Sequence, residues 1–419
     1  MEFDRTLILY EMMDNTMAKK MMILGASALQ VPAIKKAKEM GYEVISVDYD
    51  PDAVGFALAD VKLVVSTLDQ EEVLRQARIY NPDVIITSTS DGPVRTAAYV
   101  NEKMGKQPDL SYEDSICATI KSHMRERLKE CNVPIPQYYA VANKEEFVEA
   151  VQEINGNMIV KPADNAGSRG VVLLKKDPVT GKTQPEDSIS VYEYSKGNSR
   201  NGIVMVEEYM EGEEVSVESM TVNGETTIIT ITDKLTTPPP YFVELGHAEP
   251  SRHPLELQGK IKEVTKQAVA AIRLQNGPSH TEVKLTKDGP KIVELAARLG
   301  GDFITSKLVP LSTGVDMVGN SVVLATGGAI DLYKKWDKGA AIRFIPGKTG
   351  TIESIEIPEK VHDLPGIEEI VLYKSVGDAV DGTKSSNDRL GHVVAIGADA
   401  KEAIARAEEV VEKISIIYA

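Results

Sequence analysis

Short apolar runs alternate with amphipathic stretches through the first quarter of the chain. The apolar runs cover residues 21–24, 44–47, 61–65 and 84–87, and helical patterns such as 32–40 and 70–80 lie between them. Short apolar runs separated by helices are typical of the buried strands of a parallel sheet. The pattern therefore predicts an amino-terminal parallel α/β domain.

The pattern changes near residue 110. A helical stretch over residues 117–131 stops before Pro134, and strands with glycine turns follow. A last segment opens with a strand at 340–344 and ends in an amphipathic helix at 400–414, for which Asp399 is a candidate N-cap. The class is thus α/β combined with α+β. The expected parts are an extension that need not be ordered, an α/β domain, a central domain and a carboxy-terminal α+β segment, at residues 1–20, 21–110, 111–335 and 336–419.

Size, charge and cysteine content limit the function classes. The 419 residues, 42% of them apolar, can bury more than one core, and the net charge of −16 argues against general nucleic-acid or anionic-membrane binding. No apolar run approaches the ~20 residues of a spanning helix. Two cysteines, Cys117 and Cys131, indicate neither a disulfide framework nor a zinc site. We expect a soluble, cytoplasmic protein, and Met17 is a candidate native start because the residues before it are patternless.

The first strand-to-helix turn bears a partial likeness to a dinucleotide-binding turn. Gly25 opens it, and Asp48 ends the second strand as an acidic residue does in that fold. Ser27 and Gln30 stand where two further glycines are needed for close approach to a pyrophosphate. An ordinary tight turn is therefore favoured, and a nicotinamide-dependent dehydrogenase is kept as an alternative.

A hairpin is predicted for residues 280–296, because two strand-like runs flank the turn sequence Lys-Asp-Gly-Pro at 287–290. Val283 and Leu285 should share one face with two apolar residues of the second strand. This packing places residue 283 opposite 295 and residue 285 opposite 293 in the predicted register.

The same register places two carboxylates on the other face. Glu282 then lies opposite Ala296, and Glu294 lies diagonally from Glu282 within side-chain reach. The alternation brings Arg298 to this face, and the turn Leu-Gly-Gly-Asp follows it. Two carboxylates with a cation suit magnesium-assisted phosphoryl chemistry, although a solvated polar face is the simpler alternative. Lys284 is expected to balance the charge of these carboxylates.

A glycine loop joins two further strand-like runs. Residues 158–161 end in Lys161, and the loop contains Gly167 and Ser168 before the next run at 171–174. Its backbone amides could contact phosphate oxygens, but an ordinary flexible hairpin has the same pattern. The strand, polar connection and strand at 203–217 could likewise be a simple link between domains.

Taken in order, these pieces resemble the ATP-grasp superfamily over nearly the whole chain from residue 20 onward. The resemblance implies an amino-terminal pre-ATP-grasp domain, a two-part ATP-binding region and a small carboxy-terminal segment. It implies ATP and Mg2+ as cofactors. The ATP-binding residues would be Lys121 and Lys161 for phosphates, Gly167 and Ser168 in the loop, Glu207, Glu208 and Met210 for adenine, and Glu214 for ribose; Glu282 and Glu294 would bind magnesium.

One departure from the family pattern narrows the branch. Many members have an asparagine two residues after the second glutamate, whereas this chain has Ala296, which removes a metal ligand and counts against biotin carboxylase. The run Ala-Arg-Leu-Gly-Gly-Asp is more similar to the carboxylate-amine ligases that join amino acids, and Arg298 matches their catalytic arginine. His247 falls where that branch approaches its substrate, although a loop histidine on the polar surface is the simpler interpretation.

The resemblance implies an enzyme that converts a small-molecule carboxylate into an acyl phosphate for attack by an amine, with release of ADP and phosphate. It is compatible with a homodimer. A bicarbonate-activating enzyme similar to one half of the carbamoyl-phosphate synthase large subunit, and a purine-biosynthetic ligase, remain as enzymatic alternatives. An inactive nucleotide-binding sensor is the alternative from another class.

Overall fold

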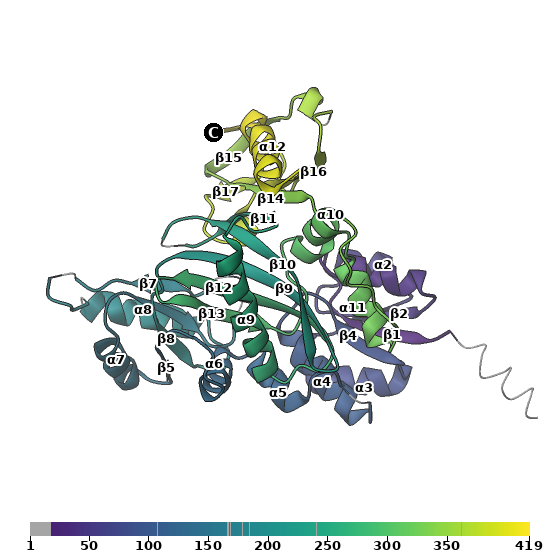
Figure 1. Cartoon of the computed structure of the whole chain (residues 1–419), viewed down its shortest axis with the longest axis horizontal. Helices are drawn as coiled ribbons and strands as arrows, with labels where there is room; N and C mark the ends of the chain where they lie inside the picture. The colour runs from purple at the N-terminus through teal and green to yellow at the C-terminus, as the bar shows by residue number, and fades with distance from the viewer. Residues whose placement is uncertain are drawn as a thin grey trace, which may run out of the picture. The chain divides into compact units, whose positions relative to one another are not determined.

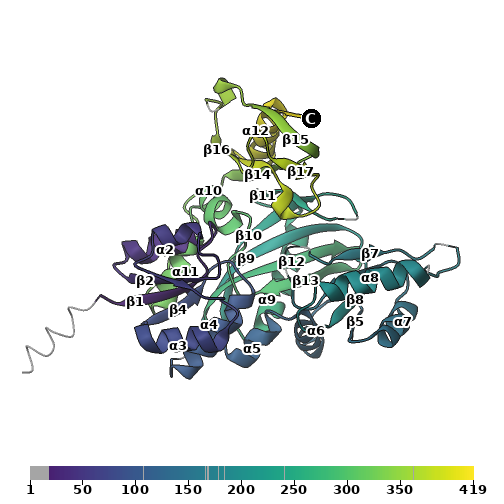
Figure 2. The same cartoon turned by 180° about the vertical axis from the view of Figure 1, so that it is seen from behind.

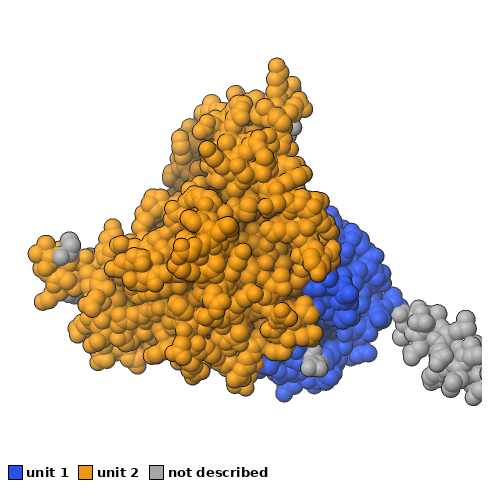
Figure 3. All heavy atoms as spheres, viewed as in Figure 1, with its two compact units in different colours: residues 1–112, 318–330 blue, residues 113–317, 331–419 orange. Residues whose placement is uncertain are grey.

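A computed structural model describes residues 18–106, 108–165, 167, 169–177, 179–183, 185–239, 241–361 and 363–419, without the side chains of 185–187. The hypotheses about Met17 and the amino-terminal extension concern residues that lie largely outside this part of the chain. Two compact units are distinguished in Figure 3: Met1–Tyr112 with Val318–Ile330, and Glu113–Met317 with Asp331–Ala419.

The first unit contains the predicted parallel sheet. Its strands are β1 (Lys20–Leu24), β2 (Glu43–Asp48), β3 (Val61–Val64) and β4 (Val84–Thr87), in the order β3-β2-β1-β4. All three pairings are parallel, which confirms the prediction. The helices α2 (Val31–Glu39), α3 (Gln70–Tyr80) and α4 (Gly92–Lys103) alternate with these strands, as the apolar pattern indicates.

The first turn of this sheet is closed by a side chain. Gln30 accepts a hydrogen bond from the Ser27 backbone at 3.0 Å and donates one to Thr89 at 2.7 Å. A Cβ atom added to Gly25 would lie 3.0 Å from the Gln30 side chain. Asp48 accepts a hydrogen bond from the Ala26 backbone at 2.8 Å. These contacts agree with the interpretation as a tight strand-to-helix turn.

The second unit contains a four-stranded antiparallel sheet. Its strands are β5 (Tyr138–Val141), β6 (Met158–Pro162), β7 (Val172–Leu174) and β8 (Val204–Glu208), in the order β5-β8-β6-β7. The helices α7 (Lys144–Glu153) and α8 (Pro185–Gly197) lie beside it in Figures 1 and 2. Phe147, Ile154 and Tyr192 fill the core between these layers.

An eight-stranded sheet forms the rest of the framework, in the order β13-β12-β9-β10-β11-β14-β18-β16. Its strands are β9 (Glu213–Val222), β10 (Glu225–Thr236), β11 (Glu244–Glu249), β12 (Gly277–Thr286), β13 (Gly289–Ala296), β14 (Gly339–Ile345), β16 (Ile367–Leu372) and β18 (Gly391–Gly397). The helix α9 (Leu255–Ala271) packs on β10, β12 and β13 (Figure 1). This sheet therefore continues from the predicted hairpin into the carboxy-terminal segment.

The carboxy-terminal helix agrees with its prediction. It is α12 (Ala400–Lys413), which packs on β14 and β18, and the Asp399 side chain caps it by accepting a hydrogen bond from the Glu402 backbone at 2.8 Å. A small sheet, β17 (Ala379–Asp381), β15 (Thr349–Glu356) and β19 (Ser415–Tyr418), completes the segment. Within the described ranges, no single helix is long and apolar enough to cross a membrane, and Ile304–Thr313 and Met317–Ala325 meet that test only as a pair.

The single helix predicted over residues 117–131 is wrong. The structure has α5 (Tyr112–Cys117) and then α6 (Lys121–Glu130), with Ile120 in an extended conformation between them. At this break the Lys121 backbone donates a hydrogen bond to the Ala163 carbonyl at 2.8 Å, just after β6. This contact places Lys121 at the start of a helix, next to the glycine loop.

The predicted hairpin exists, but its register is wrong. Thr286 pairs with Gly289 across a two-residue turn, and Val283 pairs with Ile292 rather than with residue 295. A β-bulge with Val293 as the extra residue then shifts the pairing, so that Glu282 lies opposite Glu294. Because of the bulge, Ile292 and Leu295 both face the core, opposite Val283 and Thr281.

Candidate active site

The two proposed magnesium ligands are direct cross-strand neighbours. Glu282 of β12 pairs with Glu294 of β13, so their side chains share a face, as predicted, and lie opposite each other rather than diagonally. Like charges in this arrangement repel each other unless cations neutralise them. The pair therefore forms a small site that favours positive charge.

Each glutamate is neutralised by a lysine from another part of the second unit. The Lys121 ammonium lies 2.8 Å from Glu294 Oε1 and also donates a hydrogen bond to the Asn165 carbonyl at 2.8 Å. The Lys234 ammonium lies 2.8 Å from Glu282 Oε1. Lys121, the predicted phosphate-binding residue, is thus next to the carboxylates. Its contact with a phosphate stays a prediction.

Lys234 is the centre of a cluster that the sequence did not reveal. Its ammonium lies 2.7 Å from Glu214, 2.7 Å from Glu244 and 2.8 Å from Glu282. Burial opposes the charge, but the three carboxylates raise the pKa of Lys234 well above its ordinary value. Lys284, expected to balance the metal-site carboxylates, instead lies 3.6 Å from Glu214. Lys234 fills that role because the side chain of residue 234 reaches across β9 to β12.

A second buried cluster surrounds Glu207. Arg125 donates two hydrogen bonds to its carboxylate, at 2.9 and 3.0 Å, and the Lys161 ammonium lies 2.7 Å away. Burial opposes ionisation, yet the two cations lower the pKa of Glu207 to about 2. Burial and the neighbouring Arg125 and Lys121 lower the pKa of Lys161. The Glu207 carboxylate is therefore fully engaged with two cations.

The other predicted nucleotide residues follow the same strand and loop. Glu208 ends β8, with its carboxylate 3.3 Å from the Lys291 ammonium, and Met210 is buried just beyond. Gly167 has φ +67° with open space around its Cβ direction, a conformation that favours glycine. Ser168 lies outside the described residues. The adenine, loop and ribose assignments, including Glu214, stay predictions.

Behind the carboxylate pair lies a buried histidine that the sequence analysis did not assign. His280 Nδ1 is 2.6 Å from Glu218 Oε1, and His280 Nε2 is 3.8 Å from Glu282 Oε1. Burial lowers the pKa of His280, but the Glu218 carboxylate outweighs it and raises that pKa to about 9. A protonated imidazole therefore lies between two acids at neutral pH.

The turn after β13 carries the predicted catalytic arginine. The Arg298 guanidinium donates a hydrogen bond to the Leu299 carbonyl at 2.9 Å, and its charge acts against protonation of His280. Asp302 ends the turn with φ +48° and receives two hydrogen bonds from Arg389 of the segment before β18, at 2.7 and 2.8 Å. Burial would raise the pKa of Asp302, but Arg389 and His247 hold it well below its usual range. A catalytic role for Arg298 stays a prediction.

His247 does not lie on a surface loop. It is in β11 with 0% of its surface exposed, so the interpretation as polar surface is wrong. Among the described residues neither ring nitrogen has a hydrogen-bond partner, and Nε2 lies 3.5 Å from Asp302 Oδ2. Glu244, His247 and Asp302 offer ligand atoms within 4.8 Å of one another. Lys234 and Arg389 already neutralise the Glu244 and Asp302 carboxylates, so this group is part of a network of ion pairs.

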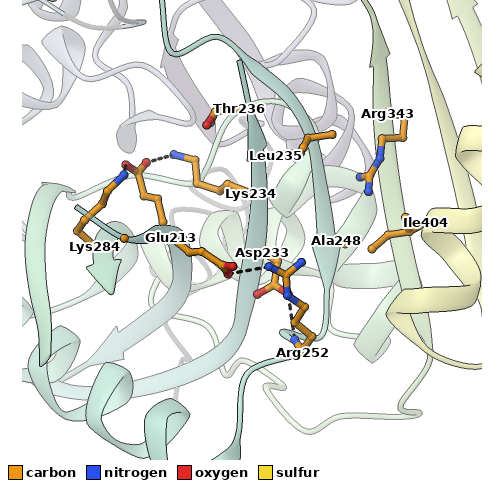
Figure 4. A pocket seen from close by; sticks show the side chains of 12 residues that line it. Glu213, Asp233, Lys234, Leu235, Thr236, Ala248, Arg252, Lys284, Arg343 and Ile404 are labelled. Atoms are coloured by element: carbon orange, nitrogen blue, oxygen red, sulfur yellow. Dashed lines mark hydrogen bonds and ion pairs between the residues drawn. The ribbon is translucent and has the colours of Figure 1, made fainter. Parts of the chain in front are cut away.

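A pocket of about 340 Å³ adjoins the Lys234 cluster. Figure 4 shows its lining, in which Arg252 contacts Glu213. Glu214 also lines the pocket and lies 2.7 Å from the Lys234 ammonium. Glu282 does not line the pocket. The pocket therefore lies beside the metal-site carboxylates and reaches Glu214, the predicted ribose residue.

The residue types at the carboxylate pair fit a magnesium ion. Magnesium prefers hard oxygen ligands and is commonly bound by one or two carboxylates together with substrate phosphates. Glu282 and Glu294 provide such oxygens side by side, and the ammonium groups of Lys121 and Lys234 show that this face holds cations. Ala296, two residues along β13, adds no ligand atom.

Sequence comparison assigns two regions. Residues 154–306 match the ATP-grasp domain, and residues 343–419 match the L-amino acid ligase C-terminal domain 2. The chain is 27% identical over 293 residues to the alanine–anticapsin ligase of Bacillus subtilis, covering 66% of this chain and 61% of that protein. It is 25% identical over 316 residues to the L-arginine-specific L-amino acid ligase of Bacillus subtilis, covering 72% of each.

An uncharacterised protein of Sinorhizobium fredii is 28% identical over 312 residues, 73% of this chain and 62% of that protein. The chain thus spans about six tenths of the length of this protein and of the alanine–anticapsin ligase.

Solved structures agree on the fold. The L-amino acid ligase of Bacillus licheniformis superposes with a TM-score of 0.80 at 19% identity, covering 96% of this chain and all of that chain. The phosphoribosylglycinamide synthetase of Anaerococcus prevotii gives a TM-score of 0.75 at 22% identity, with the same coverage. With the two matched domains, these likenesses confirm the predicted ATP-grasp architecture: the chain contains an ATP-grasp domain at residues 154–306 and the L-amino acid ligase C-terminal domain 2 at residues 343–419.

Proposed function

We propose that this chain is an ATP-dependent carboxylate-amine ligase that joins an amino acid to an amine, the amine of a second amino acid included. The observation that carries the proposal is the pair Glu282 and Glu294, which lie directly opposite each other with one lysine on each and with Arg298 in the turn that follows. Both glutamates, Lys234 and Arg298 lie within the matched ATP-grasp domain, and Lys121 precedes it. Amino acids are the proposed substrates because the relatives named for alanine and L-arginine ligation are 27% and 25% identical to this chain.

The reaction requires a carboxylate to lose an oxygen, and hydroxide is a poor leaving group. The substrate carboxylate attacks the γ-phosphorus, the bond from this phosphorus to the β-γ bridging oxygen breaks, and ADP leaves with that electron pair. The amine nitrogen then bonds to the acyl carbon, phosphate leaves with the electrons of the broken C–O bond, and the amine gives up a proton. Mg2+, when bound by Glu282 and Glu294, would neutralise phosphate charge during this transfer.

The lysines and the arginine have separate roles in this proposal. Lys121 and Lys161 hold phosphate oxygens, and Lys121 exchanges its Glu294 contact for one with a phosphate when nucleotide enters. Arg298 stabilises the charge that develops on the transferred group. The loop containing Gly167 covers the phosphates and excludes water that would hydrolyse the acyl phosphate.

A matrix of amino acids against amines with Mg-ATP, scored by phosphate release and by mass spectrometry of the product, tests the proposal. ADP and phosphate should form in equal amounts with the condensed product, and only when acid and amine are both present. ADP formation with bicarbonate or with a purine intermediate instead would reassign the enzyme. ATP binding without ADP formation across the whole matrix would favour an inactive sensor.

Two further expectations accompany this proposal. We place the reaction in the cytoplasm, where ATP is abundant and where the free thiols Cys117 and Cys131 stay reduced. A homodimer is the expected assembly. Light scattering coupled to gel filtration would measure its mass directly.

A further inference from the structure

His280 occupies the middle of a row that crosses three strands. It pairs with Glu218 of β9 on one side and with Ala296 of β13 on the other. Nδ1 lies 2.6 Å from Glu218 Oε1, and Nε2 lies 3.8 Å from Glu282 Oε1. The imidazole thus directs one nitrogen at a fully buried carboxylate and the other at a proposed metal ligand.

Ala296, in the same row, has no side-chain group that could hold the Glu282 carboxylate in place. Ala296 presents a methyl group toward the site, so at this row β13 supplies neither a ligand atom nor a hydrogen-bond donor. Lys234 donates a hydrogen bond to Glu282 at 2.8 Å, but its ammonium also lies 2.7 Å from each of two other carboxylates. His280 Nε2, at 3.8 Å, faces the Glu282 carboxylate without such sharing.

The same ion pair supports the turn that carries Arg298. A Cβ atom added to Gly300 would lie 2.7 Å from Glu218 Oε2 and 2.9 Å from His280 Nδ1. The Gly300 backbone therefore lies directly against the Glu218–His280 pair, where a larger residue would displace it. The Glu218–His280 pair thus lies against both the face that carries Glu282 and the start of the turn that carries Arg298.

We propose that the Glu218–His280 pair positions the Glu282 carboxylate for a divalent cation, with Glu218 fixing which imidazole nitrogen faces Glu282. The inference rests on the proposed function, because it takes Glu282 as a metal ligand. Partners behind a metal ligand orient its oxygen atoms, and their loss typically weakens metal binding by 10–100-fold. His280 is a positioning residue in this scheme and does not itself contact the metal.

Two amide substitutions separate the roles of the two ring nitrogens. The amide nitrogen of His280→Gln can occupy the place of Nε2 and donate to Glu282, whereas that of His280→Asn reaches only the place of Nδ1. Ser279→Ala is the matched control, because Ser279 is the neighbouring residue of β12, faces away from the site and bonds Ser219 of β9 at 2.6 Å. It perturbs the same two strands and leaves Glu282 untouched.

Calorimetry of Mg2+ binding to the full chain with ADP present gives the readout, and thermal melts report folding. His280→Asn should raise the Mg2+ dissociation constant about 10–100-fold. His280→Gln should recover most of that loss. Ser279→Ala should bind Mg2+ as tightly as the wild type, and the affinity of the variants for ADP without metal should stay unchanged. If His280→Asn does not fold, Glu218→Gln serves in its place, with a smaller rise expected because its amide oxygen still accepts from Nδ1.

Several results would contradict the inference. Wild-type Mg2+ affinity in folded His280→Asn or Glu218→Gln, with a lower melting temperature alone, would make the pair purely structural. Equal losses in the Gln and Asn variants of His280 would also exclude a donor role for Nε2. Failure of the unsubstituted chain to bind Mg2+ with ADP would overturn the proposed metal site as well, and that outcome is distinguishable from the other two.

Discussion

Replacing Lys234 with methionine should destabilise the second unit by about 3 kcal/mol at pH 7.5, at the lower end of the range for breaking a buried ion pair. The substitution keeps the apolar length of the side chain and removes a cation within 2.8 Å of three carboxylates, those of Glu214, Glu244 and Glu282. These carboxylates are 21–27% exposed and can partly rehydrate, which limits the loss. Chemical denaturation followed by fluorescence of Trp336, the single tryptophan of the chain and part of the second unit, measures it.

The loss should also grow with pH. Because the pKa of Lys234 is raised, its charge contributes fully and constantly to the free energy of unfolding below about pH 10. Burial raises the pKa of Glu282, whereas Lys234 and His280 lower it, so losing Lys234 should raise this pKa relative to the wild type. The stability difference between variant and wild type should therefore be larger at pH 8 than at pH 5. A loss below about 1 kcal/mol, or one equal at both pH values, would refute this reasoning. The control is Lys260→Met, which removes an exposed ion pair with Glu256 and should leave the midpoint of chemical denaturation unchanged.

Three further outcomes follow from the same structure. Burial raises the pKa of Glu249 to about 8, although the carboxyl accepts two hydrogen bonds, so the stability of the wild type should fall as pH rises from 4.5 to 8. Across that pH range, Glu249→Gln should become more stable than the wild type by on the order of 4 kcal/mol, as measured by denaturation at each pH. Glu207→Gln leaves Arg125 and Lys161 without their carboxylate and should cost about 3–5 kcal/mol at pH 7; the lowered pKa of Glu207 means that this difference shrinks as pH falls from 4.5 toward 2, and a constant difference would contradict the assignment. Arg298→Ala should reduce ADP formation about 10²–10³-fold while calorimetry shows unchanged ATP affinity, and unaltered turnover would exclude its catalytic role.

Local patterns predicted the elements well, because burial and periodicity are recorded in neighbouring residues. The parallel strands of the first unit and the helix capped by Asp399 appear as expected. The hairpin shows the limit of this approach. The shared face of Glu282 and Glu294 follows from alternation alone, but their register depends on a bulge at Val293 that the turn sequence does not encode.

The charge networks were less accessible because their members lie far apart in the chain. Lys121 is 173 residues from Glu294, and Arg125 is 82 residues from Glu207. A partial signal for Lys234 did exist, since a lysine sits in the long strand-like run that became β10. Sequence alone could mark that lysine as unusual, but only the strand order shows which carboxylates it meets.

The ion pair between Asp302 and Arg389 has a consequence for recombining this chain with its relatives. The matched carboxy-terminal domain begins at residue 343, so a chimera joined there would take Asp302 from one parent and residue 389 from the other. If the second parent has no arginine at that position, the Asp302 carboxylate of the chimera would lose the guanidinium partner that it has in this chain. The two residues therefore need to be inherited together, and a productive exchange would transfer residues 298–302 along with the carboxy-terminal segment.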